Sequence, residues 1–133
     1  KKVIFICTGN ACRSQMAEGF LKHYKSNEYK VYSAGTNPTK VHPAAIKVMS
    51  ELNINISNHT SDHMNDFLNK KIDIVITVCD DANQKCPIFP ESQKSIHWSI
   101  EDPFINWSDD ENLLDPYRKC RDAIKKRIKE FIN

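Results

Sequence analysis

A cysteine and an arginine stand six residues apart where a predicted strand gives way to a predicted helix. The segment Cys7–Ser14, called here the oxyanion loop, reads Cys-Thr-Gly-Asn-Ala-Cys-Arg-Ser. The apolar run Val3–Ile6 precedes it, and a helical pattern begins at its end. In a loop of this kind, backbone N–H groups and the helix N-terminus converge on an anion. The pattern therefore predicts a site for a phosphate-like oxyanion.

Cys7 is the candidate nucleophile of the oxyanion loop. The field of the loop amides, with Arg13 beside the sulfur, is expected to depress the pKa of Cys7 and hold the reactive thiolate. Gly9 and Asn10 suit the turn, and Ser14 can donate a hydrogen bond to the sulfur. A buried, inert cysteine at a strand end is the alternative. The residues expected to bind the anion are Thr8, Gly9, Asn10, Ala11, Cys12, Arg13 and Ser14.

Two further cysteines flank a polar segment. Cys79 directly follows the strand-like run Ile72–Val78, and Cys86 lies seven residues later. Because the carboxyl ends of parallel strands form the functional edge of an α/β sheet, Cys7 and Cys79 are expected at the same edge. If the polar segment is helical when reduced, its cysteines lie roughly 10 Å apart along the axis, and a disulfide requires unwinding. Reversible disulfide chemistry is the favoured interpretation, and two unrelated surface cysteines are the alternative.

Asp102 is the candidate proton donor, because transfer of an oxyanion must protonate the leaving group. It follows the last predicted strand, and Pro103 fixes a turn that would aim it over the loop. An ordinary Asp-Pro turn explains the same two residues. Of the remaining cysteines, Cys120 is expected to pack in the core, and Cys12 to fill space under the loop, with a side disulfide to Cys7 still open.

Composition narrows the class of protein. The 133 residues, with 19 basic and 17 acidic side chains, predict a single domain over residues 1–133. A formal net charge of +2, with no basic stripe interleaved with aromatics, does not favour nucleic-acid binding. No apolar run spans a bilayer and no signal-peptide pattern is present, which predicts a cytoplasmic protein without membrane association.

The cysteine count argues against structural disulfides. Five cysteines form an odd number, and a chain without a secretory signal does not favour a disulfide framework. A zinc site is not predicted either, because His59 and His63 lie in a turn-rich segment with no third ligand nearby.

Strand-like and helical patterns alternate along the whole chain, which predicts a three-layer α/β domain around a parallel sheet. Four strands are expected, at Lys2–Ile6, Lys30–Ala34, Ile72–Val78 and Ser95–Ile100. Helices are expected at Arg13–Lys25, at Pro43–Leu52 and at Ser61–Leu68, the last capped by Ser61 or Asp62. A C-terminal helix is indicated by an apolar stripe at Tyr117, Cys120, Ile124, Ile128 and Phe131.

With these residues assembled, the chain resembles the thioredoxin-coupled arsenate reductases, which share the low-molecular-weight tyrosine phosphatase fold. The resemblance covers nearly the whole chain. Phosphatases of this fold share the oxyanion loop, whereas Cys79 and Cys86 single out the reductases. The segments that carry the resemblance are Phe5–Asn10, Cys12–Gly19, Val31–Gly35, Ile56–Ser61, Thr77–Cys79, Cys86-Pro87, His97-Trp98 and Asp102-Pro103.

The resemblance implies a detoxifying reduction of arsenate to arsenite that confers arsenical resistance. Cys7 would attack arsenic while Arg13 and the loop amides hold the oxyanion, with Asp102 as proton donor. Cys79 would then attack Cys7 and release arsenite. Cys86 would convert the Cys7–Cys79 disulfide into Cys79–Cys86, which thioredoxin reduces.

The resemblance also implies a monomer that takes phosphate or sulfate as arsenate analogues, and a potassium ion near the loop. Phe104 departs from the reductases, which usually have a small residue there, and is closer to the aromatic of the phosphatases. A tyrosine phosphatase using Cys7, Arg13 and Asp102 therefore stays an alternative, as does a thiol redox sensor. The positions that match the potassium ligands are Asn10, Glu18, Ser33 and Asp62.

Overall fold

The computed structural model describes residues 1–85, 89 and 92–133. Cys86, the predicted third redox thiol, lies outside the described residues. All strands of the single sheet run parallel, in the order β2-β1-β3-β4. The strands are β1 (Lys2–Cys7), β2 (Lys30–Gly35), β3 (Ile74–Thr77) and β4 (Lys94–His97).

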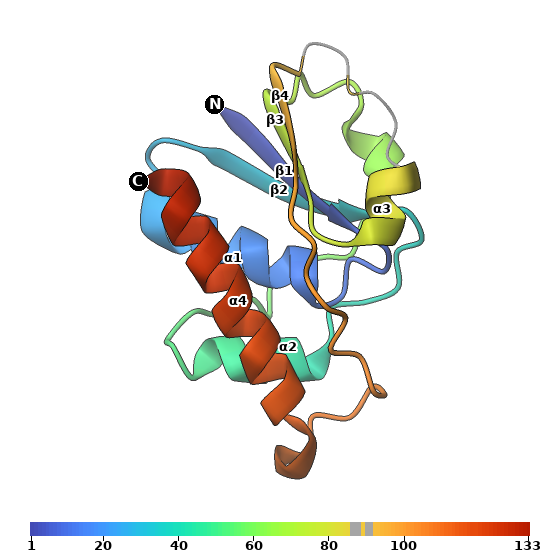
Figure 1. Ribbon diagram of the computed structural model, residues 1–133, viewed down its shortest axis with the longest axis vertical. Helices are drawn as coiled ribbons and strands as arrows, with labels where there is room; N and C mark the ends of the chain where they lie inside the picture. Colours follow the sequence, from blue (N-terminus) through green and yellow to red (C-terminus); the bar gives the residue numbers. More distant parts are fainter. Residues whose placement is uncertain (86–88, 90–91) are drawn as a thin grey trace.

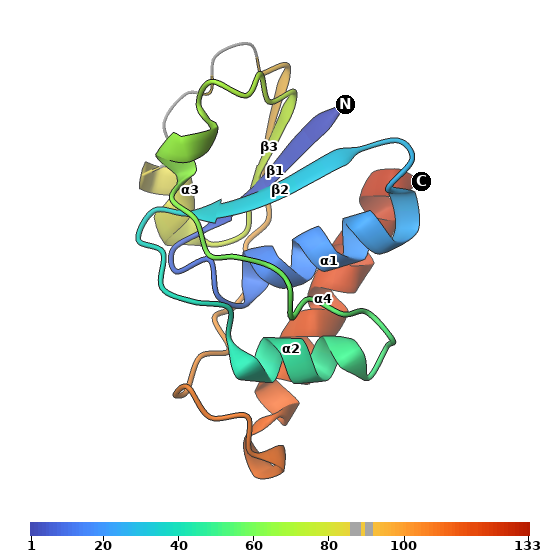
Figure 2. The same ribbon diagram turned by 180° about the vertical axis from the view of Figure 1, so that it is seen from behind.

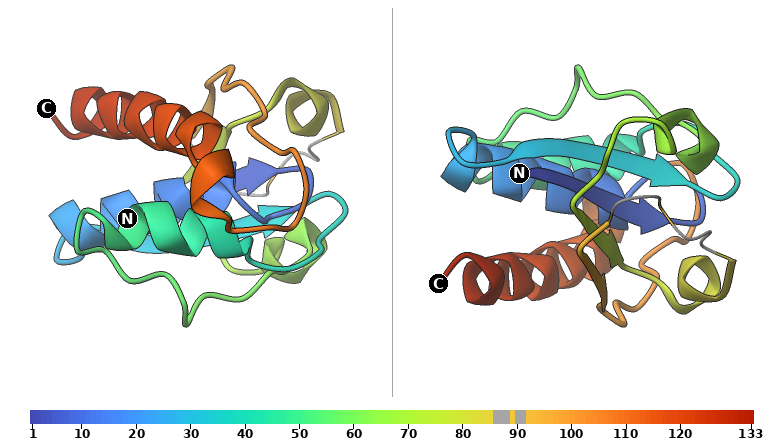
Figure 3. Two further views of the ribbon diagram at one scale, coloured as in Figure 1. Left: turned by 90° about the horizontal axis from the view of Figure 1, so that it is seen from below. Right: turned by 90° about the horizontal axis from the view of Figure 1, so that it is seen from above.

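Helices cover both faces of this sheet. Figure 1 shows α1 and α4 on one side and α3 on the other, and the end-on views of Figure 3 agree. Seen from behind in Figure 2, α2 packs beside α1 and α4. The three-layer α/β prediction is confirmed. The helices are α1 (Arg13–Lys25), α2 (Pro43–Ser50), α3 (Asp80–Lys85) and α4 (Asp115–Ile132), with short 3-10 turns η1 (Met64–Phe67) and η2 (Glu111–Leu113).

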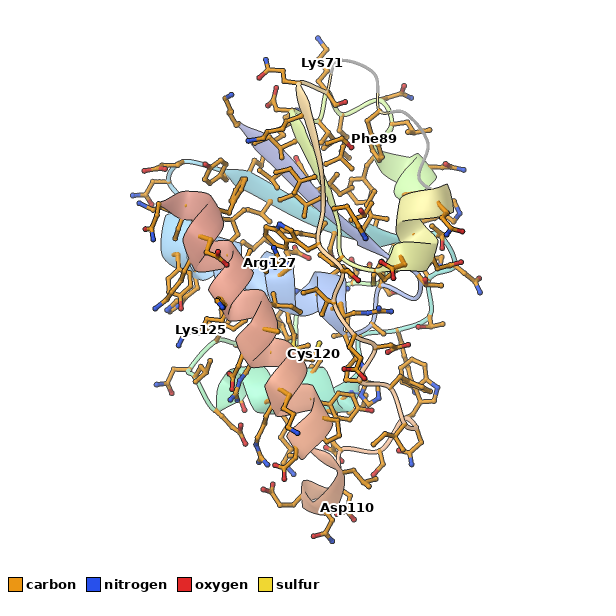
Figure 4. The ribbon with its side chains drawn as sticks, in the orientation of Figure 1. Lys71, Phe89, Asp110, Cys120, Lys125 and Arg127 are labelled. Carbon is orange, nitrogen blue, oxygen red and sulfur yellow. The ribbon has the colours of Figure 1, made fainter. Side chains whose placement is uncertain are left out.

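The core lies between the sheet and the α1–α4 layer. β1 is central in the sheet, and its apolar residues are completely buried, as expected for a strand covered on both faces. The apolar stripe predicted for α4 is buried at Tyr117, Ile124 and Ile128, whereas Phe131 at its end is only partly buried. Cys120, labelled in Figure 4, is buried on this stripe, so its prediction as a core residue is confirmed.

The predicted helix over Ser61–Leu68 is wrong over half of its length, because only η1 (Met64–Phe67) is helical, as a 3-10 turn. Neither Ser61 nor Asp62 caps it; the side chain of His63 accepts the N–H of Asn65 instead. Ser61 and Asp62 are engaged elsewhere: the Ser61 hydroxyl and the Asp62 N–H both donate to the oxyanion loop. These tertiary contacts take the place of the expected capping bonds.

Several predicted boundaries also shift. The strand expected at Ile72–Val78 is limited to β3, and the strand expected at Ser95–Ile100 begins one residue earlier and ends at His97. The helix expected to reach Leu52 ends at Ser50. No helix in the described parts of the chain has the length and apolar character required to cross a membrane.

The carboxyl ends of β1 and β2 bring Gly35 against the oxyanion loop. Gly35 pairs with Cys7, and its N–H donates to the carbonyl of Asp62 at 2.8 Å. A Cβ atom on Gly35 would lie 2.5 Å from the Thr8 carbonyl oxygen and 3.0 Å from the Asn10 nitrogen. Only glycine therefore lets the strand approach the loop this closely.

We predict that Gly35→Ala lowers the free energy of unfolding by about 1–3 kcal/mol, because its methyl group must displace loop backbone. Stabilisation of the fold by phosphate should also be lost. Urea unfolding with and without phosphate measures both effects. Gly9→Ala is the comparison for the change in stability, since its Cβ meets side-chain atoms, the Thr39 hydroxyl at 3.3 Å and the Ala11 Cβ at 3.9 Å, and no backbone. Equal stability and equal phosphate response of Gly35→Ala and wild type would contradict the prediction.

Candidate active site

The oxyanion loop connects β1 to α1, and its backbone is pinned from outside. Asn10 adopts a left-handed conformation with φ of 48°, which asparagine tolerates better than most residues. The C=O and the following N–H of a trans peptide point in opposite directions, so carbonyls bonded outward turn their N–H groups inward. The outward bonds are Thr36 N–H to Cys7 O, Asn37 N–H to Thr8 O, Thr39 N–H to Gly9 O and His42 N–H to Ala11 O.

The N-terminus of α1 adds further donors to the loop. Cys12 precedes the helix without forming a side-chain cap, and the first turn contains no acidic residue. The first N–H groups of a helix have no partner within it and carry the positive end of the helix dipole. The loop and this helix end together form a site suited to an anion.

Cys7 lies at the bottom of this site. Its side chain is 2 % exposed, and its Sγ is 2.9 Å from the Ser14 hydroxyl oxygen. Burial raises the pKa of the Cys7 thiol; hydrogen bonds from the Ser14 hydroxyl and N–H and the charge of Arg13 oppose this effect without outweighing it. The expected depression of the Cys7 pKa is therefore wrong, because desolvation of the thiolate exceeds its stabilisation by the loop.

A chain of buried hydrogen bonds fixes the direction of the Ser14 hydroxyl. The side-chain NH₂ of Asn10 donates to Ser14 Oγ at 2.7 Å and to Ser33 Oγ at 3.0 Å. Ser33 in turn donates to the carboxylate of Glu18 at 2.6 Å. Because Ser14 Oγ already accepts from Asn10, its own proton is free to donate to Cys7, which favours the thiolate over the thiol.

Arg13 and Asp102 face one another at the entrance of the loop. Arg13 Nη1 donates to the Ile100 carbonyl at 3.0 Å, and Nη2 lies 3.7 Å from Asp102 Oδ2. The side chain of Asp102 is 59 % exposed, so its carboxylate contacts solvent while it also lines the cavity next to Arg13. The other carboxylate oxygen, Oδ1, accepts the N–H of Phe104 at 3.0 Å. This bond closes a turn around Pro103, where the sequence predicted one.

These groups surround a cavity of about 200 Å³. Phe104 and Trp107, 44 % and 37 % exposed, provide an aromatic rim above the oxyanion loop. The sequence did not identify Trp107 and Thr39 as site residues. A tryptophan in an acidic segment could have indicated that Trp107 lies at a binding site. The cavity is lined by Cys7, Thr8, Gly9, Ala11, Cys12, Arg13, Thr39, Asp102, Phe104 and Trp107.

Cys79 lies beside the oxyanion loop, two residues after β3. Its Sγ is 3.4 Å from the Thr8 hydroxyl and accepts the N–H of Ala82 at 3.3 Å. The Thr8 hydroxyl also donates to Asp81 Oδ2 at 3.0 Å, which ties the start of α3 to the loop. Cys79 is buried, with 2 % of its surface exposed. The polar segment after Cys79 forms the helix α3. The sequence analysis predicts that a disulfide between Cys79 and Cys86 requires such a helix to unwind.

The other described cysteines are buried free thiols. Burial raises the pKa of Cys12 well above its usual value and the pKa of Cys120 to about 12. Both therefore stay protonated near neutral pH. Among the described cysteines, Cys7, Cys12, Cys79 and Cys120, each is free.

The four positions matched to a potassium ion lie close together, because Asn10 donates to Ser33 and accepts the Asp62 N–H, and Ser33 donates to Glu18. Glu18, Ser33 and Asp62 line one hollow of about 330 Å³, and the side chain of Asn10 bonds to two of these residues. Lys22 lines the same hollow, and its ammonium group forms an ion pair with Glu18. In the described ranges, no three His, Cys, Asp or Glu side chains gather in an arrangement that would hold a metal ion.

Comparison with known proteins agrees with this geometry. An arsenate reductase of Halalkalibacterium halodurans is 47% identical over 132 residues, which cover 98% of this chain and 95% of the relative. A solved arsenate reductase in its phosphate-binding state matches with a TM-score of 0.80 and 35% identity, over 99% of this chain and 96% of that one.

A thioredoxin-dependent arsenate reductase of Corynebacterium glutamicum matches with a TM-score of 0.75 and 32% identity, over 98% of this chain and 59% of that one. The family model of low molecular weight phosphotyrosine protein phosphatases matches residues 2–133. The chain, with its cysteine-and-arginine oxyanion loop at the carboxyl edge of a parallel sheet, belongs to the low molecular weight phosphotyrosine protein phosphatase family, whose fold it shares with the arsenate reductases.

Proposed function

We propose that this protein is an arsenate reductase that converts arsenate to arsenite with electrons from its own thiols. The observation that carries the proposal is the second thiol at the oxyanion loop, Cys79 Sγ, 3.4 Å from the Thr8 hydroxyl. Hydrolysis of a phosphate ester has no use for a second thiol there, whereas a two-electron reduction needs one. The relatives named arsenate reductase support the same assignment.

The first stage of the proposed reaction uses the oxyanion loop. The inward N–H groups and Arg13 hold the oxygens of arsenate, a tetrahedral anion of the same shape as phosphate and sulfate, which should compete with it. Cys7 gives its proton to an oxygen of the bound arsenate, and its thiolate attacks arsenic to form an S–As bond. An oxygen of arsenate leaves as water after Asp102 supplies a proton.

The second stage transfers the electrons. Cys79 attacks the sulfur of Cys7, so an S–S bond forms, the S–As bond breaks and its electron pair stays on arsenic. Arsenic is thereby reduced from As(V) to As(III) and leaves as arsenite, while two thiols are oxidised to one disulfide. Cys86 then attacks Cys79 and frees Cys7. A thioredoxin dithiol reduces the remaining disulfide by exchange, as the thioredoxin-dependent relative suggests.

The proposal places the enzyme in the cytoplasm, because a cycle that ends in thiols needs a reducing compartment. It acts as a monomer, since each thiol of the cycle belongs to one chain. Its role in the cell is arsenical resistance.

A side activity as a phosphatase for aryl phosphates is the second candidate function. The rim formed by Phe104 and Trp107 favours it, because an aromatic leaving group bound through the loop would lie against these rings. Asp102 would protonate the leaving oxygen and water would release phosphate from Cys7. Arsenate has no substituent large enough to use the rim.

The proposal includes a bound potassium ion, which would stabilise the site and take no part in the reaction itself. Oxygen atoms of Glu18, Ser33 and Asp62 around one hollow are the ligand type that a hard cation takes. The ion would compete with the Lys22 ammonium for the charge of Glu18, and its contribution would be to hold Ser33 against Asn10.

The decisive test is arsenate-dependent NADPH oxidation with thioredoxin and thioredoxin reductase, run beside hydrolysis of p-nitrophenyl phosphate. Wild type should turn over arsenate. Cys79→Ser and Cys86→Ser should lose this turnover and keep most of the hydrolysis, whereas Cys7→Ser should lose both. After one turnover, mass spectrometry should find arsenic on Cys7 in Cys79→Ser and a Cys7–Cys79 disulfide in Cys86→Ser.

Cys120→Ser is the control for this series, because its buried thiol has no part in the cycle and should leave turnover within twofold of wild type. The reductase assignment fails if wild type reduces arsenate no faster than Cys79→Ser, with the phosphatase as the better account. A Cys79–Cys86 disulfide that forms with peroxide but never with arsenate would identify a redox sensor instead.

The rate of Cys7 modification should depend on Ser14. Ser14→Ala removes the hydroxyl that donates to the sulfur, so the pKa of Cys7 rises further and the alkylation profile moves to higher pH. At pH 7, alkylation of Cys7 by iodoacetamide should be about tenfold slower, the effect of one hydrogen bond to a charged group. Site-resolved mass spectrometry measures it.

Ser33→Ala is the matched control for this experiment, because it removes the other acceptor of Asn10 without touching Cys7. It should leave the alkylation profile close to that of wild type. An unchanged profile in Ser14→Ala would show that the hydroxyl does not stabilise the thiolate.

A further inference from the structure

The segment Asp102–Trp107, called here the acid loop, is held by two buried side chains from distant parts of the chain. One is His42, which immediately precedes α2, and the other is Tyr117 in the first turn of α4. Both are completely buried. Neither lines the cavity, so the reaction itself leaves their burial and polar contacts unexplained.

The two ring nitrogens of His42 have opposite roles. Nδ1 accepts the N–H of Ala44 at 2.9 Å and so caps α2. An accepting Nδ1 carries no proton, so the proton of the neutral ring is on Nε2. Nε2 lies 2.6 Å from the carbonyl oxygen of Asn106 and therefore donates to it. Only neutral His42 makes both bonds at once.

Tyr117 holds the same stretch of backbone. Its hydroxyl donates to the carbonyl of Asn106 at 3.2 Å and accepts the N–H of Ile105 at 3.3 Å. Two backbone groups of the acid loop, the Ile105 N–H and the Asn106 C=O, thus bond to buried side chains. Loss of either side chain would leave backbone groups without these partners.

The rings of the rim pack on His42. Trp107 stacks on the imidazole with 5.0 Å between ring centroids, and Phe104 meets it edge-on at 5.6 Å. The N–H of Phe104 also donates to Asp102 Oδ1 at 3.0 Å. The position of Phe104 therefore sets the direction of the Asp102 carboxylate, and His42 sets the position of Phe104.

We propose that neutral His42, together with Tyr117, is a positioning residue that docks the acid loop so that Asp102 faces Arg13 and the aromatic rim stands over the cavity. Its effect on turnover rests on the proposed reductase and phosphatase reactions. Its effect on the acid loop does not depend on them.

The charges around His42 make the neutral form dominant near neutral pH. Burial lowers the pKa of His42 and the nearby ammonium of Lys40 lowers it further, while the bond to the Asn106 carbonyl and the charges of Asp109 and Asp102 act in the opposite direction. Tyr117 faces the ring from α4 as a neutral phenol. Since the folded pKa lies below the usual histidine value, docking persists at neutral pH and is lost as pH falls through that lowered pKa.

Trp107 reports on the docking. A Trp98→Phe background leaves Trp107 as the remaining tryptophan, because the chain contains two. A protonated imidazole stacked on an indole quenches its fluorescence, and release of the acid loop exposes the ring to water. We expect an acid transition of Trp107 emission below the usual histidine pKa, and a fall in kcat through the same transition for arsenate and for p-nitrophenyl phosphate.

His42→Asn separates docking from helix capping. Asparagine is a good N-cap and can accept the Ala44 N–H, but it is too short to reach Asn106. The acid transition should disappear, and kcat at pH 7 should fall about tenfold because Asp102 is misplaced. Affinity for inorganic phosphate should stay within twofold of wild type, since the oxyanion loop is unchanged. Tyr117→Phe, which keeps the ring and the cap, should lower kcat in the same way.

The proposal is overturned if both variants keep kcat within twofold of wild type, or if His42→Asn retains the acid transition. A parallel loss of kcat, phosphate affinity and melting temperature would also overturn it, because that is the result of a merely structural role. If wild type does not reduce arsenate, the proposed function fails by itself. The emission transition and p-nitrophenyl phosphate hydrolysis still decide the role of His42.

Discussion

The site depends on one constraint, that the oxyanion loop keeps its N–H groups inward. A short loop between a strand and a helix has no internal partners that enforce this. The segment after β2 does so from outside, with backbone donors from Thr36 to His42 bonded to the loop carbonyls. Gly35 permits the close approach that these bonds require, because any Cβ there would strike Thr8 and Asn10. The shape of the anion site therefore depends on the end of β2 and the segment after it as much as on the loop itself.

The same constraint explains which features the sequence could predict. Cys7, Arg13 and Ser14 are contiguous with β1 and α1, so their spacing already places them around one anion. Alternating strand and helix patterns were sufficient to predict the three-layer arrangement, because parallel sheets bury apolar strands on both faces. Cys79 followed from the rule that active sites lie at the carboxyl ends of strands.

The remaining features depend on contacts between distant parts of the chain. Ser61 and Asp62 looked like helix caps, and nothing local to them indicates that they bind the oxyanion loop. The pKa of Cys7 depends on its complete burial, which residue types alone do not reveal. The contact of His42 with Asn106 joins residues 64 positions apart in the chain, so no local pattern predicts it.

The two proposed reactions share one anion site, and the difference between them lies in the residues that surround it. Cys79, the proposed electron source, lies on the α3 side, while Phe104 and Trp107 form a hydrophobic rim on the side of the acid loop. Reduction uses the first and ester hydrolysis the second. Both proposed reactions use Cys7, Arg13 and Asp102, which is why the oxyanion loop alone does not distinguish them.

The most direct test of the account is a thiol count after a single turnover without any external reductant. The fully reduced protein has five cysteines, and arsenate should release one arsenite per chain while the titratable thiols fall from five to three. Phosphate under the same conditions should leave all five. An unchanged thiol count with no arsenite released would contradict the assignment of Cys7 and Cys79 as the electron source.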